Sequence, residues 1–248
     1  VGYEVTTYRI DGDYLDGRHP SCVEFSDRLT DDLCRRDFTI NAMAYNDRTG
    51  LVDEYGGIAD INNKVIRCVG NPVERFTEDA LRMMRAIRFS AQLGFSIESN
   101  TYQAIEQLSK NIQKVSMERV CVELKKTLMS ANPDFCGLYG STSLFKDILP
   151  QLHESFTARY AKRILLTCKY TENELPLKLA ACLSNGTPED ARNTLRHLRM
   201  DNKTIDTVVR LLTHCKTPIE ETEPAIREAL HTYGRDIFNL IIKYETAV

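Results

Sequence analysis

Metal-binding clusters, disulfide frameworks and long apolar runs are all missing from this 248-residue sequence. The eight cysteines are scattered and form no CxxC pair, which argues against metal ligation through sulfur. Such cysteines are typical of a reducing, cytoplasmic compartment, where each is expected to be a small buried apolar side chain. No apolar run is long enough to cross a bilayer, and the first ten residues lack the features of a signal peptide. We therefore expect no membrane partner.

An excess of positive charge is missing as well. The chain has 32 Lys and Arg against 35 Asp and Glu, a net charge of −3 at pH 7. This balance excludes a protein that coats a polyanion over its whole surface, so any contact with nucleic acid has to come from local basic patches. RNA contacts of this local kind remain possible, and DNA is not expected as a partner.

The pattern of apolar and turn-forming residues predicts an α+β, mostly helical fold. Strands are expected at 2–10, 21–25 and 51–57, with a loop between the first two and a turn at 47–50. A helix is expected at 30–46, and from Thr77 onward apolar residues recur at helical spacing to the end of the chain. Because the chain opens on Val within a strand-like stretch and ends without a capping signal, we expect it to be part of a longer sequence.

One segment, RFTEDALRMMRAIRF at 75–89, carries arginines at a regular spacing of three: Arg82, Arg85 and Arg88. A single helix with Thr77 as its N-cap is predicted here. Its apolar face, expected to join the core, consists of Ala80, Met84, Ile87 and Ala91.

The charged face of this helix is only partly explained by local pairing. Glu78 and Asp79 lie three and four residues before Arg82, a spacing that forms stabilising pairs on a helix. Arg85 and Arg88 have no acid partner on the same helix. Their partner is therefore either a carboxylate from another segment or a bound anion.

Three motifs resemble, in order and spacing, the class II tRNA nucleotidyltransferase and bacterial poly(A) polymerase family of polymerase-β-like enzymes. They are CRRDFTINAMAYN, LVDEYGGIADINNKVIRCVG and RFTEDALRMMRAIRFSAQLGFSIESNT, and the match runs from about residue 3 to 102. SMERVCVELKKTLMSANP extends it more weakly. The resemblance implies part of a nucleotidyltransferase head with a mixed sheet at 1–68, a helical neck at 69–132 and a helical, tRNA-binding body at 133–248.

The resemblance also implies roles for individual residues. Asp79 and Arg82 would read the incoming base with support from Glu78, and Arg85 and Arg88 would lie near the triphosphate. The ribose and phosphates would be engaged by Arg36, Asp37 and Asn41. An acceptor-only carboxylate beside a donor-only guanidinium complements the amine and ring nitrogen that cytosine and adenine share, and mismatches guanine and uracil.

The family's main metal ligands, an Asp-x-Asp pair on a strand, do not occur in this sequence. The DGD at 11–13 lies in a loop context and is interpreted as a decoy. Glu4 is the candidate catalytic residue and third ligand of a two-Mg²⁺ site, with a partly buried structural role as the alternative. The catalytic pair therefore either lies in upstream sequence or is lost in an inactive protein.

A second departure from the family concerns the metal-dependent phosphohydrolase segment that many relatives carry. The corresponding stretch here, LAACLSNGTPED, has neither the His nor the Asp. The remaining histidines of the helical half have no ligand spacing, so phosphohydrolase activity is not supported. They are His153, His197, His214 and His231.

The prediction is therefore a cytoplasmic, CCA-adding nucleotidyltransferase that uses CTP, ATP and Mg²⁺ to extend tRNA. A poly(A) polymerase of the same family is the close alternative, although EDALRMMRAIRF favours the CCA-adding branch. A catalytically inactive RNA- or nucleotide-binding protein is the alternative from another class. The sequence does not single out the residues of the body that contact RNA.

Overall fold

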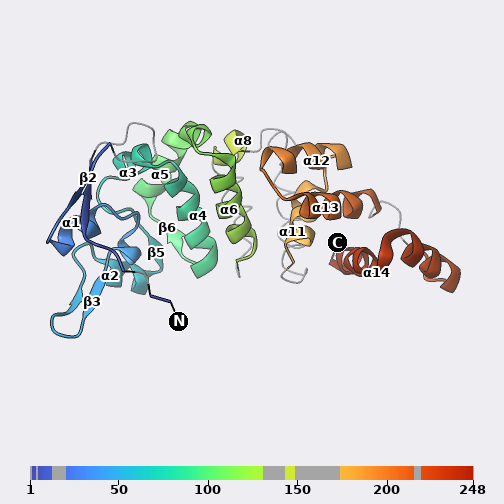
Figure 1. Ribbon diagram of the computed structural model, residues 1–248, viewed down its shortest axis with the longest axis horizontal. Helices are drawn as coiled ribbons and strands as arrows, with labels where there is room; N and C mark the ends of the chain where they lie inside the picture. The colour runs from blue at the N-terminus through green and yellow to red at the C-terminus, as the bar shows by residue number, and fades with distance from the viewer. Residues whose placement is uncertain are drawn as a thin grey trace. The chain divides into compact units, whose positions relative to one another are not determined.

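The computed structural model describes residues 2–3, 5–12, 21–130, 143–148, 174–214 and 219–247. The chain forms two compact units, one of residues 1–116 with 142–147 and the other of 117–141 with 148–248 (Figure 1). The described residues are mostly helical with short strands, which confirms the predicted fold class. The further division into head, neck and body at 68 and 132 stays a prediction.

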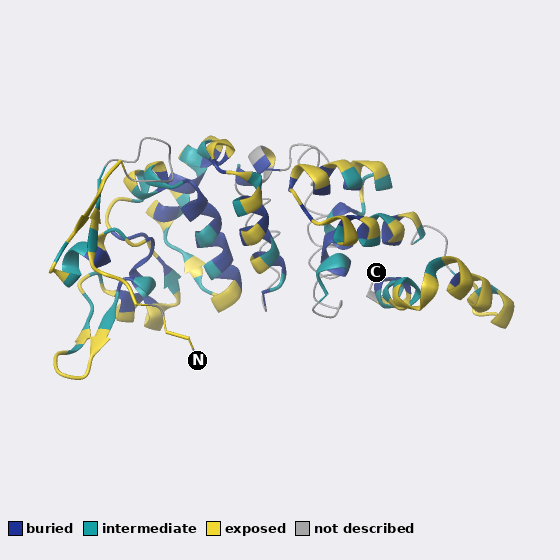
Figure 2. Ribbon diagram, viewed as in Figure 1, coloured by how far each residue is buried: buried dark blue, intermediate teal, exposed yellow. Residues whose placement is uncertain are grey.

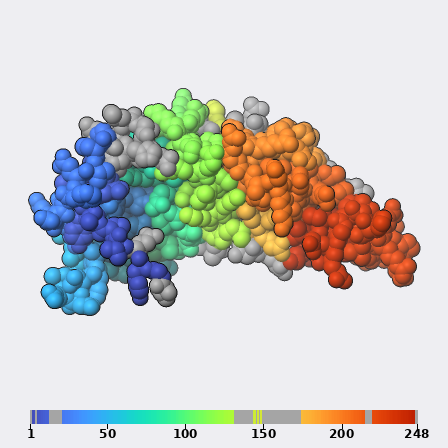
Figure 3. Space-filling model, in the orientation of Figure 1, coloured from blue at the N-terminus to red at the C-terminus, as the bar shows by residue number. Residues whose placement is uncertain are grey.

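The strands of the first unit form three two-stranded sheets within the described residues. β1 (Arg9–Asp11) pairs antiparallel with β2 (Val23–Phe25), and β3 (Ala44–Asn46) pairs antiparallel with β4 (Gly50–Val52). β5 (Val65–Ile66) and β6 (Ser96–Ile97) are parallel. The predicted turn at 47–50 closes the β3–β4 hairpin, which projects from the surface of this unit (Figure 3). The strand predicted at 2–10 is too long, because among its described residues the ladder with β2 begins only at Arg9.

The first unit also contains five helices and two 3₁₀ segments within its residues 21–116. They are α1 (Leu29–Cys34), the 3₁₀ turn η1 (Thr39–Asn41), α2 (Gly57–Asn63), α3 (Pro72–Glu78), α4 (Leu81–Leu93), α5 (Ser99–Leu108) and the 3₁₀ segment η2 (Ser109–Lys114). Met84, Ile87 and Ala91 on α4 are buried, as is its N-cap Ala80, which confirms the predicted core face. Figure 2 shows the buried residues along α4.

The predicted helix at 30–46 is wrong beyond its first turn. α1 ends at Cys34, and Phe38 is extended with φ −128° and ψ 151°. Phe38 bridges antiparallel to Cys68, and the Thr39 N–H donates to the Arg67 carbonyl at 3.0 Å. A fully buried aromatic followed by β-branched residues favours this pairing over continued helix.

The single helix predicted over 75–89 is also wrong, since the chain breaks between α3 and α4. Asp79 is extended, with φ −144° and ψ 104°, and its carboxylate Oδ1 accepts the Leu81 N–H at 3.0 Å. An Asp side chain that bonds a nearby backbone N–H competes with helix formation in this way. Thr77 is therefore no N-cap, and Glu78 lies at the end of α3 instead of the first turn of a helix.

The second unit is helical throughout its described part. It contains α6 (Met117–Leu128), α11 (Leu175–Leu183), α12 (Pro188–His197), α13 (Asn202–His214) and α14 (Glu223–Ala247), and α8 (Leu144–Ile148) lies at the boundary of the two units. α12 begins with a capping box between Thr187 and Asp190. α14 is interrupted at Gly234, where φ is 74°.

A buried lysine ties two helices of this second unit together. The ammonium of Lys178 on α11 donates to the Leu128 carbonyl at the end of α6, at 2.9 Å. A cation there satisfies a carbonyl that the helix leaves open.

The prediction that the cysteines are buried holds for some and fails for others. Cys68 and Cys121 are buried, and burial raises the pKa of Cys68 to about 12. Cys22 and Cys34 are exposed, and Cys182 is partly exposed. The other three cysteines lie outside the described residues. No helix in the described ranges combines the length and apolarity needed to span a membrane.

Candidate functional site

The break between α3 and α4 lies between the two residues predicted to read the base. The Asp79 carboxylate accepts the Leu81 N–H, and the Asp79 carbonyl accepts the Arg82 N–H at 3.0 Å. On the other side, the Asp79 N–H donates to the Arg75 carbonyl at 3.3 Å, so the backbone is held on both sides of Asp79. The predicted base-reading pair lies within one turn, although not on one continuous helix.

Arg82 is held in a clamp that leaves 11% of its side chain exposed. Its Nη1 donates to Glu78 Oε2 at 2.6 Å and to the Arg75 carbonyl at 3.1 Å. Its Nη2 donates to the Arg35 carbonyl at 3.1 Å. Glu78 is in turn paired with Arg75 Nη2 at 2.5 Å. The Glu78 carboxylate thus fixes the direction of the Arg82 guanidinium, and its role in reading a base stays a prediction.

Arg85 finds its partner in another segment. Its Nε donates to Asp37 Oδ2 at 2.6 Å, and the other carboxylate oxygen accepts the Phe38 N–H at 3.0 Å and the Asn41 amide at 3.3 Å. Of the two alternatives left open, a distant carboxylate is therefore the observed one. The ion pair joins two sets of predicted nucleotide-binding residues, on the 36–41 segment and on α4.

Arg88 is directed differently from Arg85. Its guanidinium stacks on the Phe89 ring at 3.9 Å and its Nη1 donates to Gln92 Oε1 at 2.8 Å. The Phe89 ring meets Phe38 edge to face at 5.7 Å. Arg88 is 7% exposed, so it is part of the packed interior beside the site, and its predicted position near the triphosphate stays a prediction.

Asp32 holds both arginines of the RRD motif. Its Oδ1 accepts Arg35 Nε at 3.1 Å, and its Oδ2 accepts Arg36 Nη2 at 3.0 Å. Arg36 also donates to the Asn41 carbonyl at 3.0 Å. Burial by itself would raise the pKa of Asp32, but the hydrogen bonds and positive charges of the two arginines outweigh it and hold this pKa below its usual value.

The turn that carries Asp37 is fixed from two further directions. The Thr39 hydroxyl donates to Asp60 Oδ2 at 2.7 Å, and the Val69 N–H donates to the Asp37 carbonyl at 3.1 Å. Gly57 approaches so closely that a Cβ at its position would lie 2.4 Å from the Thr39 carbonyl oxygen. The site segment thus lies between α2 and the backbone at 67–69, which follows β5.

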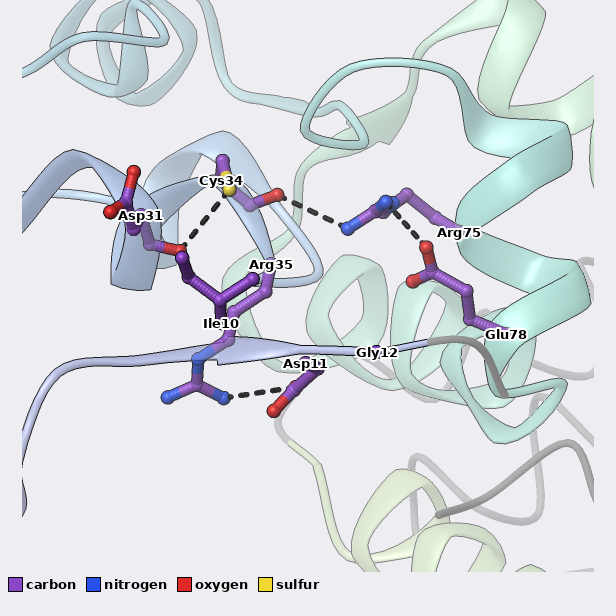
Figure 4. Close-up of a pocket in the computed structure, with 8 residues that line it drawn as sticks. All are labelled: Ile10, Asp11, Gly12, Asp31, Cys34, Arg35, Arg75 and Glu78. Carbon is purple, nitrogen blue, oxygen red and sulfur yellow. Dashed lines mark hydrogen bonds and ion pairs between the residues drawn. The ribbon is translucent and has the colours of Figure 1, made fainter. Parts of the chain in front are cut away.

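A pocket of about 240 Å³ lies next to the Arg82 clamp, between β1, α1 and α3 (Figure 4). Arg75 and Glu78 enter it from α3, and Arg35 reaches across to Asp11 on β1 at 3.6 Å. Of the predicted site residues only Glu78 lines it. The pocket is therefore a neighbour of the predicted nucleotide site, and no ligand is assigned to it.

The residues that the structure describes do not fit a two-metal site. Among them no group of three or more His, Cys, Asp or Glu side chains could hold a metal ion. Glu4, the predicted ligand, lies outside the described residues. Asp11 lies in β1, so the loop predicted for the DGD sequence is wrong at its first residue. The Asp11 carboxylate is ion-paired with Arg9 at 3.0 Å and with Arg35.

Several residues of the site were not singled out from the sequence. Arg75 is part of the Arg82 clamp, and Asp32 pairs with Arg35 and Arg36. The sequence spacing of both residues indicates these contacts. Arg75 precedes Glu78 by three residues, and Asp32 precedes Arg35 and Arg36 by three and four.

Two family models match the sequence. The Poly A polymerase head domain matches residues 1–67, and the model described as the probable RNA and SrmB-binding site of polymerase A matches residues 94–156. Together they take in more than half of the chain. The 36–41 segment lies within the first match, and α4 ends where the second begins.

Curated relatives extend the likeness to longer proteins. The CCA-adding enzyme of Enterococcus faecalis is 38% identical over 213 residues, which is 85% of this chain and 52% of that protein. The CCA-adding enzyme of Ligilactobacillus salivarius is 50% identical over 133 residues, 54% of this chain and 33% of that protein. The matches thus span a third to a half of the length of these relatives.

Solved structures agree with the fold. The CCA-adding enzyme of Bacillus stearothermophilus in complex with CTP is similar with a TM-score of 0.79 and 30% identity, over 99% of this chain and 59% of that one. The Thermotoga maritima CCA-adding enzyme in complex with tRNA is similar with a TM-score of 0.64 over 88% of this chain and 57% of that one. At 21% identity, the second likeness extends to the fold alone.

Proposed function

The chain belongs to the family of poly(A) polymerases and CCA-adding enzymes, and we propose that it acts in adding C and A to the 3′ end of tRNA from CTP and ATP without a nucleic-acid template. The observation that carries this proposal is the clamped Arg82 beside Asp79. Three hydrogen bonds orient the guanidinium and Asp79 is fixed at the helix break, so acceptor and donor groups are pre-organised before a base arrives.

The proposed selectivity follows from hydrogen-bond chemistry. Cytosine and adenine both present an amine donor next to a ring-nitrogen acceptor, which Asp79 and Arg82 complement. Guanine and uracil would oppose donor to donor and acceptor to acceptor. A charged, bidentate contact of this kind discriminates by about 1–3 kcal/mol.

We assign the triphosphate and ribose to the cluster around the Asp37–Arg85 ion pair. Arg36 lies on the same turn with 43% of its side chain exposed, and Arg85 is 34% exposed, so both cations are accessible to an anion. In the proposed reaction the tRNA 3′-hydroxyl oxygen bonds to the α-phosphorus while the bond to pyrophosphate breaks. The arginines bind and orient the triphosphate for this in-line attack.

Mg²⁺ is proposed as the cofactor, because phosphoryl transfer between nucleotides uses metal ions to neutralise the charge on the attacking and leaving oxygens. Glu4 is the proposed ligand. The proposed partner is tRNA, supported by the match to the probable RNA-binding family model over 94–156 and by the likeness to the CCA-adding enzyme of Enterococcus faecalis. A cytoplasmic location is proposed from the scattered cysteines.

The test is to incubate the intact protein with tRNA that lacks its 3′ CCA, together with CTP and ATP, and to sequence the products. Addition of C, C and A supports the proposal. Long A-tails without C indicate a poly(A) polymerase, the alternative suggested by the name of the head-domain family. Binding of CTP without any extension indicates an inactive nucleotide-binding protein.

A further inference from the structure

We propose that Asp32 is a positioning residue for nucleotide binding, which acts by pre-organising Arg36. This inference rests on the proposed function, because it takes the RRD segment as part of the nucleotide site. Asp32 itself is a buried residue of α1, with only 5% of its side chain exposed. It does not have to touch the nucleotide to act.

The contacts of Arg36 show how this positioning works. Asp32 Oδ2 receives Nη2 at 3.0 Å and Nε at 3.4 Å, and the Asn41 carbonyl receives Nη1 at 3.0 Å. The guanidinium is therefore anchored at two separate acceptors, while 43% of the side chain stays exposed. A long, flexible cation held in this way loses less conformational freedom when an anion binds to its open side.

The second oxygen of Asp32 serves the neighbouring arginine. Arg35 Nε donates to Oδ1 at 3.1 Å, and the same guanidinium is 3.6 Å from Asp11 Oδ2 on β1. One buried carboxylate thus pairs with the positive charges of two consecutive arginines. Arg35 also contacts β1, which Arg36 is not seen to contact among the described residues. Without that carboxylate, Arg35 and Arg36 would repel each other and compete for the remaining acceptors.

The chain offers a matched control one residue earlier. Asp31 is the same residue type on the same helix, but its Oδ2 accepts the Ser26 hydroxyl at 2.6 Å. An Asp31→Asn substitution removes the same charge from α1 and leaves the contacts of Asp32 with Arg35 and Arg36 in place. Any effect of general charge or helix stability should therefore appear in both variants.

The experiment measures CTP dissociation constants for the intact protein and for the variants Asp32→Asn, Asp31→Asn, Arg36→Ala and the double variant Asp32→Asn/Arg36→Ala. We expect Asp32→Asn to weaken CTP binding about tenfold, as losing a hydrogen-bonded charge partner does elsewhere. Asp31→Asn should bind as the unsubstituted protein does. In the Arg36→Ala background, Asp32→Asn should have no further effect, because its action passes through Arg36.

A merely structural role would weaken CTP binding equally in both backgrounds, and that result overturns the inference. Unchanged CTP binding in Asp32→Asn, with weaker binding in Arg36→Ala, overturns the inference and leaves the proposed function intact. If the unsubstituted protein binds neither CTP nor ATP, the proposed function itself fails. Should Asp32→Asn not fold, Asp32→Glu replaces it: the charge is kept but displaced, and CTP binding equal to that of the unsubstituted protein overturns the inference.

Discussion

Arg85 and Asp37 form a 2.6 Å ion pair although they are 48 positions apart in the sequence. The pair joins the turn after α1 to the middle of α4. Because Asp37 also accepts the Phe38 N–H and the Asn41 amide, its orientation is fixed by the turn as well as by the arginine. The cations proposed to hold a triphosphate and the residues proposed to read a base are thereby parts of one bonded framework.

Replacing Arg85 with Ala should weaken CTP and ATP binding alike, because a triphosphate contact does not distinguish the bases. The variant should also lose about 1–2 kcal/mol of unfolding free energy, since the buried Asp37 carboxylate is left without its charged partner. Dissociation constants for both nucleotides and urea unfolding check this. Arg48→Ala removes the same charge from the turn of the β3–β4 hairpin and serves as the control. A selective loss of CTP binding would contradict the triphosphate assignment.

Two substitutions at Asp79 separate its structural role from its proposed reading of the base. Asn keeps an oxygen that can accept the Leu81 N–H, so Asp79→Asn should be about as stable as the unsubstituted protein. Asp79→Ala should lose about 1 kcal/mol, the usual net contribution of one hydrogen bond, because the Leu81 N–H loses its acceptor. Both variants should lose the preference for C and A over G and U. If Asp79→Asn keeps that preference, the carboxylate does not read the base.

Gly57→Ala should destabilise the first unit by about 1–3 kcal/mol, the usual range for overpacking. The added Cβ would lie 2.4 Å from the Thr39 carbonyl oxygen and 2.8 Å from the Met43 sulfur, so the turn that carries Asp37 has to shift. Gly186→Ala is the control, because its Cβ would meet Asp190 at an ordinary 3.4 Å. Thermal unfolding midpoints of the two variants are compared, and equal midpoints would show that the contact with Thr39 is not tight in solution.

The lowered pKa of Asp32 predicts a specific pH dependence of stability. The folded protein binds this proton more weakly than the unfolded chain, whose Asp has the ordinary pKa of 3.8. The stabilisation is therefore fully present above that value and is lost as the pH falls through the folded-state pKa. The difference in unfolding free energy between the unsubstituted protein and Asp32→Asn should be constant near pH 7 and shrink below about pH 4. If this difference in unfolding free energy does not change down to pH 2, the arginines do not stabilise the ionised Asp32 carboxylate.

Local pattern was enough to predict the parts of the site that depend on near neighbours. Helical spacing paired Glu78 with Arg82 and assigned Met84 and Ile87 to the core. The same spacing could have identified Asp32 as the partner of the RRD arginines. The break at Asp79 was not predicted, because the surrounding residues favour helix and a single carboxylate-to-backbone bond decides the local conformation.

Contacts between distant segments could not be read from periodicity. The sequence indicated that Arg85 lacks a helical partner, but nothing local identified Asp37 as that partner. The extended conformation of Phe38 likewise depends on Arg67 and Cys68, about thirty positions later, which supply the backbone groups that it and its neighbours pair with. The family resemblance named these residues as one group, and their role in nucleotide binding stays a prediction. Their bonding partners come from the tertiary structure.

Asp79 and the clamped Arg82 are proposed to select the base. The most direct measurement is the set of dissociation constants of CTP, ATP, GTP and UTP for the intact protein under one condition. CTP and ATP should each bind at least about fivefold more tightly than GTP and UTP, the lower end of what a bidentate contact discriminates. Equal affinities for all four nucleotides would contradict base selection by Asp79 and Arg82.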